Sequence, residues 1–275
     1  MAQKDTRRRP QSPWYTRVVA ALAFLLLYVP LVTLIIGSFV SRLPDGTIRF
    51  TLEWYSKVMN DEAILAALGN SMVIASSNTV FSTLIGTGAA LALERGRFPG
   101  RKFFDVMIQV PLIMPEIVMG LSLLIWFVFL KITLGTFSVI LAHVTFSVSY
   151  VILTVRSRLQ GFDHSLEEAA RDLGATTFQT FWRVTLPLIL PGVVSGALMA
   201  FTLSFDDFLI TFFTGGIGSE TLPLRIYSMI RFGVSPELNA LSALMLAMTV
   251  LLVGFVFGRE GREDSQRQEA GPEAA

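Results

Sequence analysis

Long apolar stretches almost free of charged residues recur along the sequence and predict membrane-spanning helices. A bilayer core about 30 Å thick requires roughly 20 apolar residues in a helix. Six stretches meet this requirement, and the predicted spans are residues 18–40, 71–93, 106–130, 134–155, 188–213 and 238–258. The first is too long for the apolar core of a signal peptide and no Ala-x-Ala site follows it near Ser41, so we expect a retained signal-anchor.

The segments that connect these spans differ in basic residues, which predicts their orientation. Sixteen Lys and Arg residues lie in the N-terminal segment 1–17, the loops after the second and fourth spans and the tail 259–275, against six on the opposite side. Because basic loops stay in the cytoplasm, we expect both termini there. The tail 259–275 is rich in Glu, Arg, Gln and Gly without apolar periodicity, and we predict that it is disordered.

Composition narrows the chemistry that such a chain can perform. Hydrophobic residues make up 52% and charged residues 16%, the net charge is +1, and there is no cysteine. This excludes disulfides and thiolate metal sites and gives no support for nucleic-acid binding, while His143 and His164 are the two histidines. No Gly-x-x-x-x-Gly-Lys-Ser/Thr loop occurs, so we predict that the chain itself holds no cofactor and no metal and does not bind ATP.

The loop at residues 161–187 is too long and too regular for a plain linker. Ser165 followed by Glu168 is typical of a capping box, and Gly174 is suited to the left-handed end of a helix. Thr176 or Thr177 can cap a second short helix. The two predicted helices carry apolar side chains at helical spacing: Leu166, Ala169, Ala170 and Leu173 in the first, and Phe178, Phe181 and Trp182 in the second. The pattern predicts a compact two-helix knob.

This loop resembles the "EAA" loop of ABC importer permeases. The resemblance rests on Glu168-Ala169-Ala170, then Gly174, then Val184-Thr185-Leu186-Pro187 at the family's spacing, with Val184 where Ile is usual. It implies an all-α, six-helix polytopic permease of the type I (MetI-like) importer fold over residues 18–258, and no enzymatic activity of its own. It also implies that a dimer of ABC ATPase subunits binds the loop. The implied coupling residues are Glu168, Ala169, Ala170, Gly174, Leu186 and Pro187.

Segments spread over most of the chain are similar to the second permease subunit of spermidine/putrescine importers. They include Trp54-Tyr55, residues 28–39, 114–123, 142–146, 201–207, 221–228 and 233–240. This resemblance implies a polyamine substrate, a second homologous permease and a periplasmic or extracellular polyamine-binding protein. Related permeases handle opines, aminophosphonates or ferric iron, and these solutes remain alternatives.

Three carboxylates, Glu116, Asp206 and Asp207, lie within the predicted spans, which contain no Lys or Arg. A carboxylate at mid-helix costs about 2.5 to 3.5 kcal/mol, so each should face a cavity, a partner or a cation. On straight helices Glu116 would lie about 15 Å and Asp206 about 27 Å from the cytoplasmic ends, as a stepwise path for an amine would require. Aromatic candidates for cation-π contacts are Tyr150, Phe201, Phe205 and Phe208.

Structural roles for the same residues remain open. Glu116 follows Pro111 and Pro115 and could donate a proton to a carbonyl that they leave free. One of the adjacent aspartates could cap a kink or contact the partner permease, and His143 is more often a satisfied histidine of a helix bundle. An intramembrane enzyme that uses Glu116, Asp206 or His143 is the alternative from another class, but no His-Glu-x-x-His or Gly-x-Ser-x-Gly motif supports it.

Overall fold

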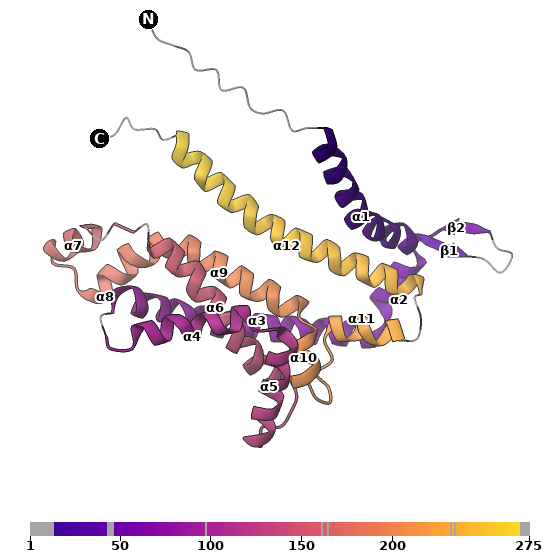
Figure 1. Cartoon of the computed structure of the whole chain (residues 1–275), viewed down its shortest axis with the longest axis horizontal. Coiled ribbons are helices and arrows are strands. Elements are labelled where there is room, and N and C mark those ends of the chain that lie inside the picture. Colours follow the sequence, from indigo (N-terminus) through magenta and orange to yellow (C-terminus); the bar gives the residue numbers. More distant parts are fainter. Residues whose placement is uncertain are drawn as a thin grey trace, which may run out of the picture. The chain divides into compact units, whose positions relative to one another are not determined.

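The computed structural model describes residues 14–42, 47–96, 98–160, 162–163, 165–231, 233 and 235–269. The contacts divide the chain into two units, one of residues 1–58 with 234–244 and one of residues 59–233 with 245–275. The elements are almost entirely helical (Figure 1). This confirms the predicted all-α class, and the two units are described separately below.

The first unit begins with the apolar helix α1 (Trp14–Ser38), whose most apolar window has no buried residue. A short antiparallel hairpin follows, in which β1 (Val40–Arg42) pairs with β2 (Ile48–Phe50). Phe39 stacks on Phe50 with ring centroids 6.0 Å apart, and the Tyr55 hydroxyl lies 2.7 Å from the Ser38 hydroxyl. Tyr55 belongs to α2 (Glu53–Asn60), so this bond ties α2 to the end of α1.

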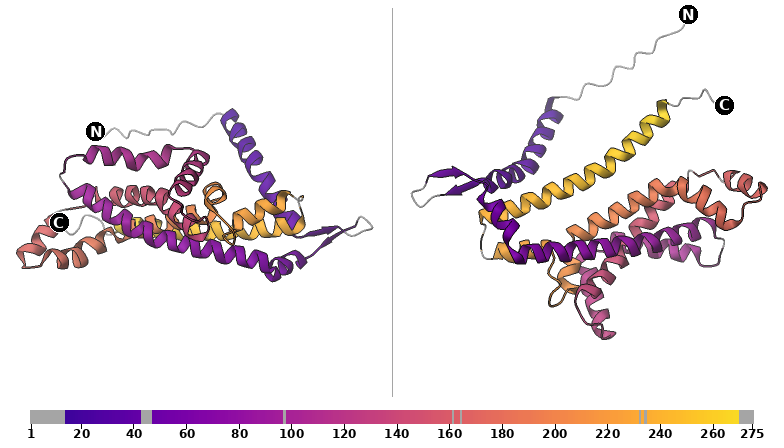
Figure 2. Two further views of the ribbon diagram at one scale, coloured as in Figure 1. Left: turned by 90° about the horizontal axis from the view of Figure 1, so that it is seen from below. Right: turned by 180° about the vertical axis from the view of Figure 1, so that it is seen from behind.

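The second unit is built around three long helices, α3 (Glu62–Arg95), α6 (Thr136–Leu159) and α9 (Leu186–Asp206), which run side by side in Figures 1 and 2. Val151 of α6 fits against Gly86 of α3 and Gly196 of α9, where an added Cβ would lie 2.7 Å and 3.3 Å from it. Such small residues let apolar helices approach closely in a membrane. The buried Asn78 amide donates to Ser147 Oγ and to the Ala200 carbonyl, which links all three helices.

Two of the predicted spans are broken in the structure. The predicted span 106–130 is split into α4 (Arg101–Ile113) and α5 (Glu116–Phe129), whose axes differ by 111°. Met114 is extended, as a residue that precedes a proline usually is, and Pro115 is the N-cap residue before α5. The predicted span 188–213 ends early, because α9 stops at Asp206 and α10 (Leu209–Thr214) begins after the extended Asp207. The single-helix prediction was therefore wrong for both segments.

The count of six spans stays a prediction. Among the described residues, four helical segments are long and apolar enough to cross a membrane, and the α4–α5 pair would make a fifth. These segments are Trp14–Ser38, Glu62–Arg95, Thr136–Leu159 and Thr177–Asp206. The predicted sixth span falls on α12 (Pro236–Glu269), in which the described stretch Pro236–Leu251 is apolar and the apolar sequence continues to Gly258. The remaining elements are α7 (Ser165–Asp172), α8 (Thr177–Thr180), the π-helix η1 (Phe181–Thr185) and α11 (Leu222–Arg231).

The ends of two helices also differ from the predictions. α3 starts at Glu62 rather than near residue 71, because the Asp61 carboxylate caps it by accepting from the Ala63 and Ile64 amides at 2.8 and 3.0 Å. α12 continues to Glu269, so residues 259–269 are helical and not disordered as predicted. This stretch is dominated by Glu, Arg and Gln, which favour helices. Residues 1–13 of the basic N-terminus and 270–275 of the tail lie outside the described residues.

Candidate functional site

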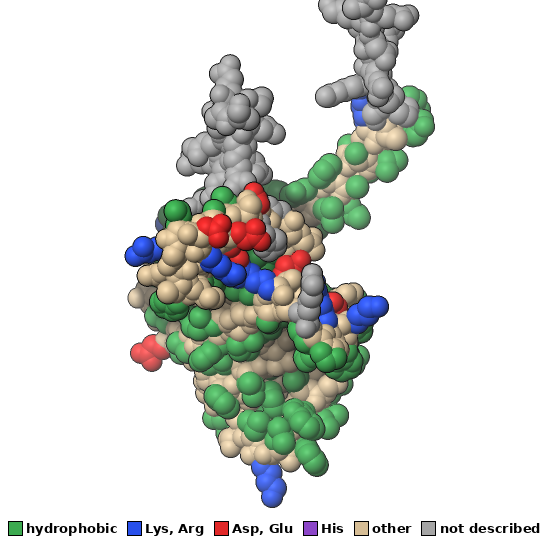
Figure 3. Space-filling model, turned by 90° about the vertical axis from the view of Figure 1, so that its left-hand side faces the viewer, with side chains coloured by type: hydrophobic (Ala, Val, Ile, Leu, Met, Phe, Trp, Pro, Cys, Tyr) green, Lys and Arg blue, Asp and Glu red, His purple; other side chains and the backbone are tan. Residues whose placement is uncertain are grey.

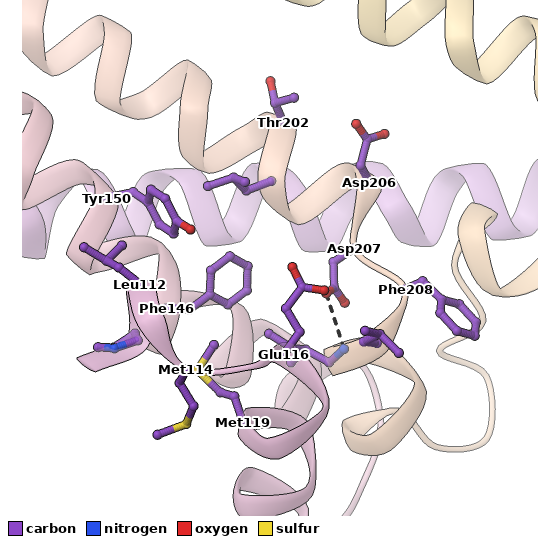
Figure 4. A pocket seen from close by; sticks show the side chains of 14 residues that line it. Leu112, Met114, Glu116, Met119, Phe146, Tyr150, Thr202, Asp206, Asp207 and Phe208 are labelled. Atoms are coloured by element: carbon purple, nitrogen blue, oxygen red, sulfur yellow. Dashed lines mark hydrogen bonds between the residues drawn. The ribbon is translucent and has the colours of Figure 1, made fainter. Parts of the chain in front are cut away.

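A cavity of about 460 Å³ lies where the α4–α5 break faces the α9–α10 break (Figure 4). Its wall is mostly apolar, with contributions from α6 and from the residues around both breaks. The polar groups that line it are Tyr150, Thr202, Glu116, Asp206 and Asp207. All three carboxylates predicted for the substrate path therefore belong to one cavity.

The helix breaks explain why the three acids meet. Glu116 is the first residue of α5 rather than a mid-helix residue, and Asp206 is the last residue of α9. The depth of about 15 Å for Glu116 assumed an unbroken helix, which the break at Met114 and Pro115 rules out, whereas α9 is continuous up to Asp206. The three acids line a single cavity between two broken segments, and their part in a substrate path stays a prediction.

The Asp207 carboxylate accepts hydrogen bonds from groups of the same chain (Figure 4). One carboxylate oxygen accepts from the Ile210 amide at 3.3 Å, and the other from the Thr211 amide and hydroxyl, both at 2.8 Å. His143 Nε2 lies 3.2 Å from the same carboxylate, whose side chain is only 5% exposed. Asp207 thus caps the start of α10 and pairs with a buried histidine, which is the kink-capping arrangement left open above.

His143 is satisfied on both ring nitrogens. Nδ1 lies 2.7 Å from Ser204 Oγ, and Nε2 lies 3.0 Å from Thr211 Oγ1, with the ring fully buried. Its partners come from α9 and α10, so the ring fixes the geometry of the break between them. This geometry agrees with the bundle-histidine interpretation and leaves no nitrogen for a ligand.

Glu116 and Asp206 differ from Asp207 because both are exposed. Within the described ranges the Glu116 carboxylate has no hydrogen-bond or ion-pair partner. It therefore makes no bond to a carbonyl that Pro111 or Pro115 leaves free, the structural role considered for a protonated Glu116. Its place in the first turn of α5 favours a negative charge, since the helix dipole is positive there. Asp206 accepts one bond, from Thr249 Oγ1 at 3.2 Å. These two carboxylates are the ones open to a cation.

The aromatic candidates separate into two groups. Tyr150 and Phe208 line the cavity, whereas Phe205 is buried and stacks on Phe201 at 5.9 Å, so that neither ring lies in the wall. Phe146 also lines the cavity and was missed. Its position four residues before Tyr150 on α6 could have indicated it, because such residues share a helix face.

The predicted knob forms as a second candidate site, and we call residues 165–185 (α7, α8 and η1) the coupling element. Gly174 follows α7 with φ +85°, as predicted for a left-handed helix end. Thr176 caps α8 in a reciprocal box with Gln179, which confirms one of the two predicted caps. The predicted box of Ser165 and Glu168 was wrong, because α7 already includes Ser165, whose amide donates to the Asp163 carboxylate at 2.9 Å.

Apolar side chains of the coupling element point away from the protein. Leu173 is 90% exposed and Phe178 is 72% exposed. Charged side chains gather at the same end of the molecule, which faces the viewer in Figure 3. Of the predicted coupling residues, Glu168, Ala169, Gly174 and Pro187 are exposed and Ala170 and Leu186 are half-buried.

The contrast between Asp207 and Asp206 gives a stability prediction. Asp207→Ala removes the acceptor of two backbone amides and the partner of buried His143, and each unsatisfied buried group costs about 1–3 kcal/mol. We expect Asp207→Ala to lower the free energy of unfolding by about 3 kcal/mol. The matched variant Asp206→Ala, on an exposed side chain, should change it by less than about 1 kcal/mol. Thermal unfolding in detergent measures both, and equal melting temperatures would contradict the capping role.

Comparison with known proteins identifies the family. Residues 82–259 match the family described as "Binding-protein-dependent transport system inner membrane component". The chain is 43% identical over 254 residues to the putrescine transport system permease protein PotI of Escherichia coli (strain K12), with 90% of each chain covered. It is 43% identical over 231 residues to the spermidine/putrescine transport system permease protein PotC of the same strain, covering 84% of this chain and 88% of that protein.

Solved structures agree on the fold. A chain of a bacterial ABC transporter that imports the acidic polysaccharide alginate matches with a TM-score of 0.69 at 14% identity, covering 90% of this chain and 95% of that one. A chain of an amino acid ABC transporter crystallised with histidines matches with a TM-score of 0.59 at 18% identity, covering 78% and 100%. The chain therefore belongs to the inner membrane components of binding-protein-dependent transport systems, the permease subunits of ABC importers.

Proposed function

We propose that this permease carries polyamines, with Glu116 and Asp206 as the groups that meet the substrate's ammonium ions. The observation that supports this most directly is the charge of the cavity wall. Among the described residues, every charged side chain that lines the cavity is a carboxylate. Two relatives of similar sequence are named for putrescine and for spermidine/putrescine transport, and both assignments concern protonated amines.

The chemistry of the cavity suits a flexible cation. A protonated polyamine loses hydration when it enters a confined site, and carboxylates can replace the lost water at each ammonium group. Tyr150 and Phe208 present rings in the same wall, where a cation over a ring face gains further attraction. The intervening methylene groups would lie against the apolar lining, which includes Met114, Met119 and Phe146.

We infer an assembly in which this chain and a second homologous permease form the pathway across the inner membrane. The coupling element, within the loop 161–187, would dock on a dimer of ABC ATPase subunits, which bind and hydrolyse ATP. Both termini and this loop would face the cytoplasm, as the distribution of basic residues predicts. A polyamine-binding protein would deliver substrate from the other side. One similar solved complex contains a substrate-bound periplasmic protein, as its description states for alginate.

Reconstitution tests this function directly. The chain, its partner permease, the ATPase and the binding protein are placed in proteoliposomes with ATP inside, and uptake of radiolabelled putrescine and spermidine is measured. We expect ATP-dependent uptake of a polyamine and none of an opine, an aminophosphonate or ferric iron. Uptake of one of those solutes in place of polyamines would contradict the proposal.

A further inference from the structure

A partly buried ion pair outside the cavity joins the coupling element to the helices of the second unit. Glu167 of α7 accepts hydrogen bonds on one carboxylate oxygen from Arg95 Nη2 and from Thr185 Oγ1. Arg95 Nη2 also lies 3.3 Å from Thr185 Oγ1, so the three side chains contact one another. The Glu167 side chain is 8% exposed and Thr185 is fully buried.

The three partners come from three different elements. Arg95 is the last residue of α3, Thr185 is the last residue of η1, and α9 begins at the next residue. Glu167 therefore connects the first helix of the coupling element to the ends of two of the three long helices that form the core. Glu168, the acidic residue of the family motif, is exposed by contrast.

The chain connection between the coupling element and α9 is itself a π-helix. The Leu186 amide donates to the Phe181 carbonyl, five residues earlier. Such wide turns hold their backbone less regularly than an α-helix and often mark functional positions. A side-chain link that bridges this turn would keep α7 from moving independently of α9.

We propose that Glu167 is a positioning residue for transport, which makes the coupling element, α3 and α9 move as one body when the ATPase changes conformation. This inference rests on the proposed docking of the coupling element on an ATPase. The link is suited to the role because the Glu167 carboxylate, which is 8% exposed, would be left buried without a partner if it separated from Arg95, whose side chain is 33% exposed.

The first experiment measures coupling in the reconstituted complex. Glu167→Gln is expected to lower polyamine uptake about tenfold while ATP hydrolysis and co-purification with the ATPase persist, so that more ATP is hydrolysed per substrate carried. The control Glu62→Gln, on an exposed acid in the first turn of α3 and outside the coupling element, should keep the ratio of ATP to substrate within about twofold. Arg95→Gln should reproduce the Glu167→Gln phenotype. The double variant should be no worse than either single one, because both remove the same link. Additive losses would overturn the inference.

A second experiment measures movement rather than activity. The chain has no cysteine, so spin labels can be placed at two introduced cysteines, Asp172→Cys on α7 and Leu84→Cys on the exposed face of α3. In the full complex we expect one narrow distance distribution with and without trapped nucleotide, and a broadened one when Glu167→Gln is added. An unchanged distribution in that variant would overturn the proposal.

The outcomes separate this inference from the proposed function. If Glu167→Gln transports normally while disruption of the docking surface at Leu173 abolishes uptake, Glu167 has no positioning role and the docking stands. If disruption at Leu173 leaves uptake unchanged, the docking itself is wrong, and the inference falls with it.

Discussion

Uptake of polyamines should fall by about 100-fold when Glu116→Gln and Asp206→Asn are combined, with assembly of the complex unchanged. Hydrogen bonds to charged groups contribute about 1.5–3 kcal/mol each, and a loss of about 3 kcal/mol in total corresponds to this factor. Both side chains are exposed and line the cavity, so their amides should not disturb folding. Initial rates of radiolabelled putrescine uptake, normalised to assembled complex, measure the effect.

The number of charges on the substrate sharpens this test. Spermidine carries one more ammonium group than putrescine, so neutralising two carboxylates should lower spermidine uptake by the larger factor. The exposed Glu62, in the first turn of α3, offers a matched control that does not line the cavity. Glu62→Gln should leave uptake within about twofold. Unchanged uptake of both polyamines in the double variant would remove the idea of an acidic path for cations.

The cavity could be predicted only in part from the sequence. The long apolar stretches can be read from the sequence because a lipid bilayer requires them. The three carboxylates within these stretches can be read from it as well. The breaks were not, since proline alone does not decide where a helix ends. Pro30, Pro111 and Pro191 lie inside helices of the structure, whereas Pro115 begins a new helix at a bend of 111°.

The break after Asp206 depends on contacts that are distant in sequence. Asp207 caps α10 while His143 on α6 holds both its carboxylate and Ser204 of α9. No local pattern indicates that a histidine more than sixty residues earlier supports this turn. The sequence alone therefore could not show that the three acids line one cavity.

In the coupling element the predicted features are local, and two of them form while the capping box of Ser165 and Glu168 does not. A left-handed Gly174 and a cap at Thr176 depend on neighbours within a few residues, and both form. Glu167 was missed because its partner Arg95 lies 72 residues away. Only the folded chain shows that the buried acid is the residue before the motif and not the motif's own Glu168.

Binding of the ATPase should be lost when Leu173→Arg is introduced. Leu173 is 90% exposed between α7 and α8 of the coupling element, which is costly unless a partner covers it. Burying a leucine contributes about 1.5–3 kcal/mol, and an unpaired arginine at the same place would add a desolvation cost. We expect the affinity for the purified ATPase to fall at least about 100-fold, as measured by titration in detergent or nanodiscs. Folding should be unaffected, since the side chain has almost no contacts to lose.

The matched control for this variant is Leu52→Arg. Leu52 is 66% exposed next to α2, in a loop that the charge distribution places on the other side of the membrane. It should leave ATPase affinity unchanged although the substitution is chemically identical. Because the chain has no cysteine, Leu173→Cys and Leu52→Cys also report sidedness with a membrane-impermeant thiol reagent. Labelling of Leu173→Cys in right-side-out vesicles would place the coupling element on the side of the membrane opposite the ATPase. Full ATPase affinity in Leu173→Arg would show that Leu173 does not contact the ATPase.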